Sequence, residues 1–258
     1  MFRPAAWPSI VLAVALSALL LSLNASSQIT EDEFNSTTID ARIGKELAVF
    51  GGRGALIGQA RADVLEILSS QGDCAIWFQE VEVEPNIAKV FRSVHYELRD
   101  GTAQVILRPD ASGTAWFKHP WGATTTEDGG KDSSIAINTH GPFFVHETRL
   151  MKVNTTSGFN WPAGWHPVMV GPYVGDTAEA RMTILLHELG HIVGRLPIDD
   201  GSWDGRSARN TVEVLQHCKA EIQLLARKRR ATARAWPQNH SAHHESLQET
   251  ISGGRSSE

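Results

Sequence analysis

The chain has 258 residues, of which 41% are hydrophobic, and its formal net charge is -5. This length suits one sizeable domain rather than two. The acidic balance gives no reason to expect a nucleic-acid partner.

Residues 1–27 have the features of a signal peptide. Arg3 supplies a positive charge, residues 10–23 form an apolar run, and small residues at 24–27 offer a cleavage site before Gln28. The run is shorter than the roughly 20 residues that cross a bilayer as a helix. We therefore expect a removable signal, a secreted or periplasmic protein, and no stable membrane insertion after cleavage.

The next part of the chain mixes helical and strand patterns. Residues 28–40 are polar and acidic, which predicts a flexible lead-in to a domain over residues 41–226. Apolar residues at helical spacing predict a helix over 55–70. Strands are then predicted at 74–78, 88–98, 103–107 and 134–138. Segments 110–132 and 154–174 are aromatic and loop-like, which is typical of substrate walls and also of small aromatic cores.

The strongest chemical signal is the pair His187 and His191 with Glu188 between them. Histidines four apart on a helix project from the same face, so the two imidazoles can share one Zn²⁺. Glu188 is then placed to act on a water bound to that metal. The alternative is an ordinary buried helix with two hydrogen-bonded histidines.

The residues around this motif predict a helix. Asp176 or Thr177 can cap its start, and Gly194 lets the chain turn directly after the second histidine. A stripe of apolar residues is expected to face the core: Met182, Leu185, Leu189, Ile192 and Val193.

Beyond the motif we predict a turn over 195–201 and a second helix that starts at Ser207 or Asn210. After Ala226 the hydrophobic periodicity ends, which predicts a disordered tail over 227–258.

Cys74 and Cys218 are the only two cysteines. An oxidising compartment favours a disulfide between them, which would tie the strand expected at 74–78 to the second helix. Two buried free thiols are the alternative.

The sequence His187-Glu-Leu-Gly-His-Ile-Val-Gly194 resembles the zincin metallopeptidases. The nearest resemblance is to uncharacterised exported bacterial metallopeptidases. Their pattern matches at His187, Glu188, His191, Gly194, Pro197, Asp199, Asn210, Thr211, Val214 and Cys218. The resemblance implies an α+β, zincin-like fold, in which a small mixed sheet packs on an active-site helix and further helices lie on either side. It also implies that Ser134–Asn138 is an edge strand that pairs with extended substrate.

A catalytic zinc takes three protein ligands and leaves the fourth position to water. The metzincin-like spacing would place the third ligand at position 197, which is proline here. We favour Asp199, two residues later, as the third ligand. Other candidates are Asp200, Glu213 as in gluzincins, and His217.

By this resemblance we expect an exported zinc-dependent peptidase that hydrolyses peptide bonds with a metal-activated water and Glu188 as general base. Its partner would be a peptide or protein substrate, and its oligomeric state is unknown. Candidate residues for stabilising the oxyanion are Tyr173, His140, His146, His166 and His217. The alternative is a binding or structural protein that keeps a degenerate zincin site without turnover.

Overall fold

The computed structural model describes residues 35–80, 86–109, 115–126, 129–152, 164–199 and 205–252. The chain divides into two compact units, Met1–Glu46 and Leu47–Glu258. In the first unit the described residues 35–46 are helical. The lead-in predicted over 28–40 is therefore helical from residue 35 onward. The predicted signal peptide lies outside the described residues.

The second unit begins with helices and continues with short strands. Its helices are α2 (Gly52–Leu68), α3 (Asp73–Gln79), α4 (Ile87–Ser93), α5 (Ala178–Ile192) and α6 (Arg206–Ser252). Its strands are β1 (His95–Arg99), β2 (Val105–Pro109), β3 (Ala115–Lys118), β4 (Ala123–Thr125), β5 (Ser134–Asn138), β6 (Glu147–Lys152), β7 (Trp165–Pro167), β8 (Met169–Val170) and β9 (Tyr173–Val174). The α+β class is thus confirmed, as are the elements expected at 55–70, 103–107 and 134–138.

Two predicted strands are helices instead. Residues 74–78 lie in α3, because a short apolar run fits a buried helix as well as a buried strand. Most of the strand expected over 88–98 is α4, whose start is capped by the Asn86 side chain accepting from the Lys89 amide. A strand does follow, but it starts only at His95. The loops expected at 110–132 and 154–174 also contain short strands, β3, β4 and β7 to β9.

The strands form three small sheets with the orders β1-β5-β4, β3-β2-β6-β7 and β8-β9. In the first sheet β5 pairs with β1 in parallel and with β4 antiparallel. Both edges of β5 are therefore occupied. The prediction that Ser134–Asn138 is an edge strand is wrong, because β4 holds that place in the sheet.

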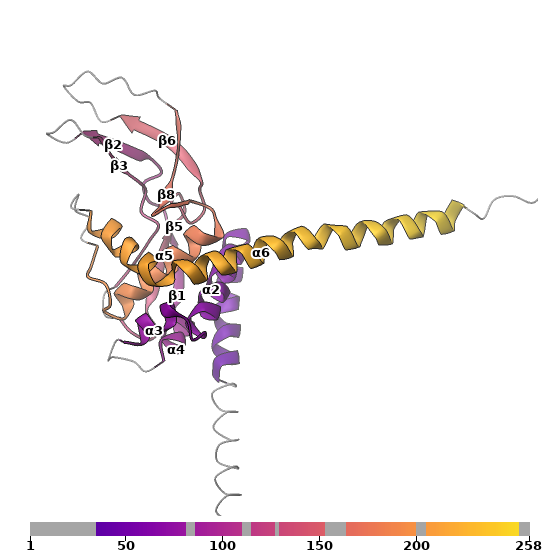
Figure 1. Cartoon of the computed structure of the whole chain (residues 1–258), viewed down its shortest axis with the longest axis horizontal. Helices are drawn as coiled ribbons and strands as arrows, with labels where there is room; N and C mark the ends of the chain where they lie inside the picture. The colour runs from indigo at the N-terminus through magenta and orange to yellow at the C-terminus, as the bar shows by residue number, and fades with distance from the viewer. Residues whose placement is uncertain are drawn as a thin grey trace, which may run out of the picture. The chain divides into compact units, whose positions relative to one another are not determined.

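Helix α5 carries the histidine motif and packs against α2, α6 and β4. Figure 1 shows α5 with α2 and α6. The Thr177 side chain caps its start by accepting from the Ala180 amide. The expected apolar stripe is buried, and every residue from Met182 to Val193 is buried with it. After the helix, Gly194 adopts a left-handed φ of 68°, a conformation that glycine takes without strain. The predicted cap, stripe and turn are confirmed.

Helix α6 starts at Arg206 and continues to Ser252, so the chain after Ala226 is helical rather than an irregular tail. The basic run is anchored by ion pairs. Lys228 contacts Glu66, Arg229 contacts Asp63, and Arg230 contacts Glu179. These contacts lie beyond the domain end predicted at residue 226, and the hydrophobic periodicity does not show them.

The predicted disulfide between Cys74 and Cys218 is present, and both residues are fully buried. It joins α3 to α6 rather than a strand to α6. Among the described residues, every helix is too short or too polar to cross a lipid bilayer.

Candidate metal centre

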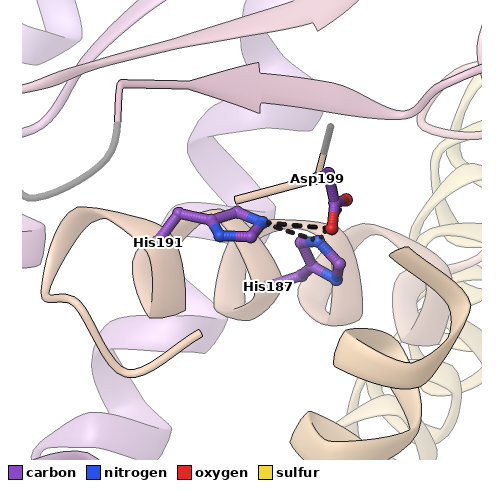
Figure 2. A group of neighbouring side chains, drawn as sticks. All are labelled: His187, His191 and Asp199. Carbon is purple, nitrogen blue, oxygen red and sulfur yellow. Dashed lines mark hydrogen bonds and ion pairs between the residues drawn. The ribbon is translucent and has the colours of Figure 1, made fainter. Parts of the chain in front are cut away.

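Three side chains converge on one point above the second half of α5. His187 Nε2 lies 3.0 Å from His191 Nε2 and 3.0 Å from Asp199 Oδ2. His191 Nε2 lies 3.7 Å from Asp199 Oδ1. Figure 2 shows the two imidazoles rising from one helix face and the carboxylate reaching them from the segment that follows the helix.

These separations suit a metal ion. Ligands about 2.1 Å from a tetrahedral zinc lie about 3.4 Å from one another. The three ligand atoms lie within 4.8 Å of one another, and both histidines are buried. Two imidazoles and one carboxylate, with a position left open, form a donor set of the kind that catalytic zinc uses. The group His187, His191 and Asp199 could therefore hold a metal ion.

The remaining ring nitrogens are hydrogen-bonded in a way that leaves both Nε2 atoms for the metal. His191 Nδ1 lies 3.3 Å from the carbonyl oxygen of Leu196, and a carbonyl can only accept, so Nδ1 carries the proton. His187 Nδ1 lies 3.1 Å from Thr211 Oγ1 on α6. Such bonds orient metal-binding histidines and fix their tautomer.

Both carboxylate oxygens of Asp199 have polar contacts. Oδ1 accepts a hydrogen bond of 2.7 Å from Asn210 Nδ2, while Oδ2 faces His187. Burial would raise the pKa of Asp199, but hydrogen bonds from His187 and His191 outweigh it and hold that pKa well below the usual range. The carboxylate is therefore ionised and ready to bind a cation.

The pKa of His191 shifts in the opposite direction to that of Asp199. Burial would lower its pKa, but the hydrogen bond to Asp199 and the nearby Glu188 carboxylate outweigh burial and raise it. The Asp199 and Glu188 carboxylates therefore create a negative electrostatic potential at the site, which favours a positive charge at its centre.

Glu188 lies next to this group and is buried, with 5% of its surface exposed. Its Oε2 atom has no hydrogen-bond partner within the described part of the chain. Burial raises its pKa to about 6, while the charges of His187 and His191 act in the opposite direction. A buried carboxylate oxygen without a partner is rare and calls for an explanation, such as a water or ion that it contacts. The residues present therefore fit a metal with a bound water.

The other candidates for the third ligand are placed differently. Asp200 lies outside the described residues. His217 stacks on Trp77 with ring centroids 4.9 Å apart. Glu213 and His217 line a shallow hollow on α6 together with Arg209 and Val212. The structure therefore assembles Asp199, and not Glu213 or His217, with the two histidines.

The residues suggested for stabilising an oxyanion have contacts elsewhere. Tyr173 lies beside Gln223 and Glu179, and Glu179 is about 12 Å before His187 along α5. His140 contacts Thr139. His146 lies 3.5 Å from Glu147, and the His166 ring packs against Phe117. Within the described residues, these contacts do not involve the three ligands.

Sequence reasoning gave Asn210 and Thr211 no role at the metal, although Asn210 was a possible helix start and both belong to the pattern that carries the resemblance. Both are buried, although they are polar and lie in the first turns of a helix. The signal in the sequence that pointed to them was the shared pattern, in which both follow the HExxH motif; their burial, which is unusual for polar residues, is visible only in the structure.

Comparisons of the chain with protein-family models, with curated proteins and with solved structures found no match.

Proposed function

We propose that this protein is an exported zinc-dependent peptidase of the zincin type. The observation that carries the proposal is the buried Glu188 carboxylate, with one oxygen unpartnered, beside the group His187, His191 and Asp199. A purely structural zinc needs four protein ligands and has no use for a neighbouring base. Three ligands with an adjacent carboxylate favour hydrolysis instead.

The residues have distinct roles in this proposal. His187, His191 and Asp199 would hold the zinc, which when bound would supply an acidified water and polarise the scissile carbonyl. Glu188 would accept a proton from the attacking water and donate it to the departing amine. Its pKa of about 6 in the absence of metal keeps it close to the range in which a carboxylate both accepts and donates a proton near neutrality.

Strand β4 is the surface where an extended substrate would pair. The strand starts beside α5, because a Cβ atom at Gly122 would lie 3.0 Å from the Ile184 side chain. Past its end, the Gly130 amide donates to the carbonyl of Ile192. Strand β4 therefore lies beside the helix that holds the histidines.

The hydrogen-bond pattern tells which backbone groups of β4 point away from β5. The Asn138 amide donates to the Gly122 carbonyl, so this opposing pair is a hydrogen-bonded one. Such pairs alternate along an antiparallel ladder, so Thr124 faces β5, whereas Ala123 and Thr125 direct their backbone groups away from the sheet. These outward groups could pair with a peptide strand.

The disulfide supports an oxidising location, because such bonds persist outside the cytosol and are rare within it. This agrees with the export expected from residues 1–27.

The test is a peptide-library digest with the zinc-loaded full chain and its Glu188→Gln variant. The variant should keep one zinc and lose hydrolysis by about 10²–10⁴-fold or more, because proton transfer contributes that much. Glu213→Gln, a carboxylate outside the ligand group, is the matched control and should cleave like the wild type. A wild type that binds zinc and cleaves nothing, as the variant does, would favour the binding-protein alternative.

A further inference from the structure

Two consecutive residues of α6, Asn210 and Thr211, contact two different members of the ligand group on other segments. Thr211 reaches His187 on α5, and Asn210 reaches Asp199 in the segment after α5. Thr211 Oγ1 faces Nδ1 of His187 rather than Nε2, and Asn210 contacts Asp199 through its amide nitrogen, so both act on a ligand from its outer side. Both are buried, with 3% and 9% of their surface exposed.

The Thr211 hydroxyl has its single proton committed. Oγ1 donates to the carbonyl of Ser207, one turn earlier on α6, at 2.9 Å. The oxygen can then only accept from His187, so His187 Nδ1 must carry a proton. Nε2 is then the nitrogen that faces His191 and Asp199, and a metal bound there would take the place of any proton that Nε2 donates to Asp199 in the metal-free protein.

Asn210 acts on the carboxylate and on the turn that carries it. Its Nδ2 donates to the Pro197 carbonyl at 2.8 Å and to Asp199 Oδ1 at 2.7 Å. One amide group therefore links the path of the segment to the carboxylate, which the Ser207 side chain also hydrogen-bonds. Oδ2 is turned toward His187.

We propose that Asn210 and Thr211 are positioning residues for the metal, each acting through one ligand: Thr211 through His187, and Asn210 through Asp199. This inference rests on the proposed metal centre and adds the part of α6 that sets its affinity. Loss of an outer partner of this kind typically weakens metal binding about 10- to 100-fold.

Zinc affinity of the full chain, measured by competition with a chelator, tests the proposal without any use of peptide hydrolysis. Thr211→Val should weaken zinc binding about 10- to 100-fold, and Thr211→Ser, which keeps the hydroxyl, should bind like the wild type. Thr183→Val is the matched control. Thr183 is also buried, and its hydroxyl bonds the carbonyl one turn earlier, that of Glu179. This control should leave zinc affinity unchanged.

A double-mutant cycle separates the two routes. In an Asp199→Ala background, Asn210→Ala should cost almost nothing further, because the residue it orients is gone. Thr211→Val should still cost its full factor there, because His187 remains. Equal zinc affinity in Thr211→Val and wild type, weak binding in Thr211→Ser, or an undiminished cost of Asn210→Ala in that background would overturn the proposal.

The two proposals fail separately. If the zinc affinities follow this pattern but the protein cleaves no peptide, the positioning role is supported and the proposed peptidase function is contradicted. If the protein cleaves peptides but its zinc affinity is the same in wild type and in the Asn210 and Thr211 variants, the peptidase function is supported and the positioning role is contradicted.

Discussion

Cys218 follows Thr211 by about two turns on α6, and its disulfide to Cys74 fixes this part of the helix to α3. The bond closes a loop with a sequence separation of 144 residues. The helix that orients the metal ligands is therefore covalently attached to a helix near the start of the domain.

The disulfide should stabilise the domain through its unfolded state. A Cys74→Ala, Cys218→Ala double variant is expected to lose about 2–4 kcal/mol of unfolding free energy in urea, and reduced wild type should behave alike. Thiol titration of unfolded, unreduced wild type should find no free thiol. Two titratable thiols, or a double variant as stable as the oxidised protein, would contradict this prediction.

The basic run after Ala226 should belong to the folded domain. Asp63 is almost fully buried, and Arg229 Nε donates to it at 2.7 Å. A chain that ends at Ala226 leaves this carboxylate without its arginine, so its unfolding free energy should fall by about 1–3 kcal/mol. A chain that ends at Arg234 keeps these ion pairs and should match the full chain. Equal stability of the two truncations would place the domain boundary at Ala226 after all.

Glu188 should lower the stability of the metal-free protein at neutral pH. Burial raises the pKa of Glu188 from 4.5 to about 6, so the folded state binds this proton more tightly than the unfolded state. The penalty is absent below pH 4.5, grows as pH rises, and is complete above pH 6. It amounts to about 2 kcal/mol.

Urea unfolding of the metal-free proteins tests this sign. Glu188→Gln should be more stable than wild type by up to about 2 kcal/mol at pH 8. The gain should shrink toward pH 4.5, where wild type is protonated. A variant less stable than wild type at pH 8 would show that the carboxylate is compensated in the folded protein.

The outward backbone groups of β4 should contribute to substrate binding. Ala123→Pro removes one outward N–H without removing a bond to β5. The loss of one hydrogen bond to a peptide should lower kcat/KM roughly fivefold and leave the zinc content unchanged. Thr124→Pro, which breaks the ladder inside the sheet, should instead destabilise the fold. Unaltered kcat/KM in Ala123→Pro would remove β4 from the substrate site.

The sequence predicted the metal helix well, because its signals are local. Thr177 caps the helix, the apolar spacing is periodic, and the two histidines are one turn apart. The residues around Cys74 were misread, since five apolar positions are compatible with either a strand or a buried helix, and the contact with α6 decides between them.

The third ligand and the positioning residues depend on distant contacts. The sequence favoured Asp199 because of its distance from His191 along the chain. Whether its carboxylate reaches the histidines depends on the path of the turn after Gly194, which only the structure shows. Thr211 and His187 are 24 residues apart, and no local pattern shows that they meet. The edge of the sheet was missed because β4 lies in segment 110–132, which the sequence predicted to be a loop, and because the parallel partner β1 lies far from β5 in sequence.

The most direct test of the metal centre is the zinc content of purified full-length protein and four single variants after dialysis against trace zinc. Wild type and Glu213→Ala should each hold one zinc per chain. His187→Ala and His191→Ala should hold almost none, and Asp199→Ala should lose most of its zinc, because the loss of one of three ligands removes most of the affinity. Full zinc content in Asp199→Ala together with its loss in Glu213→Ala would contradict the centre described above.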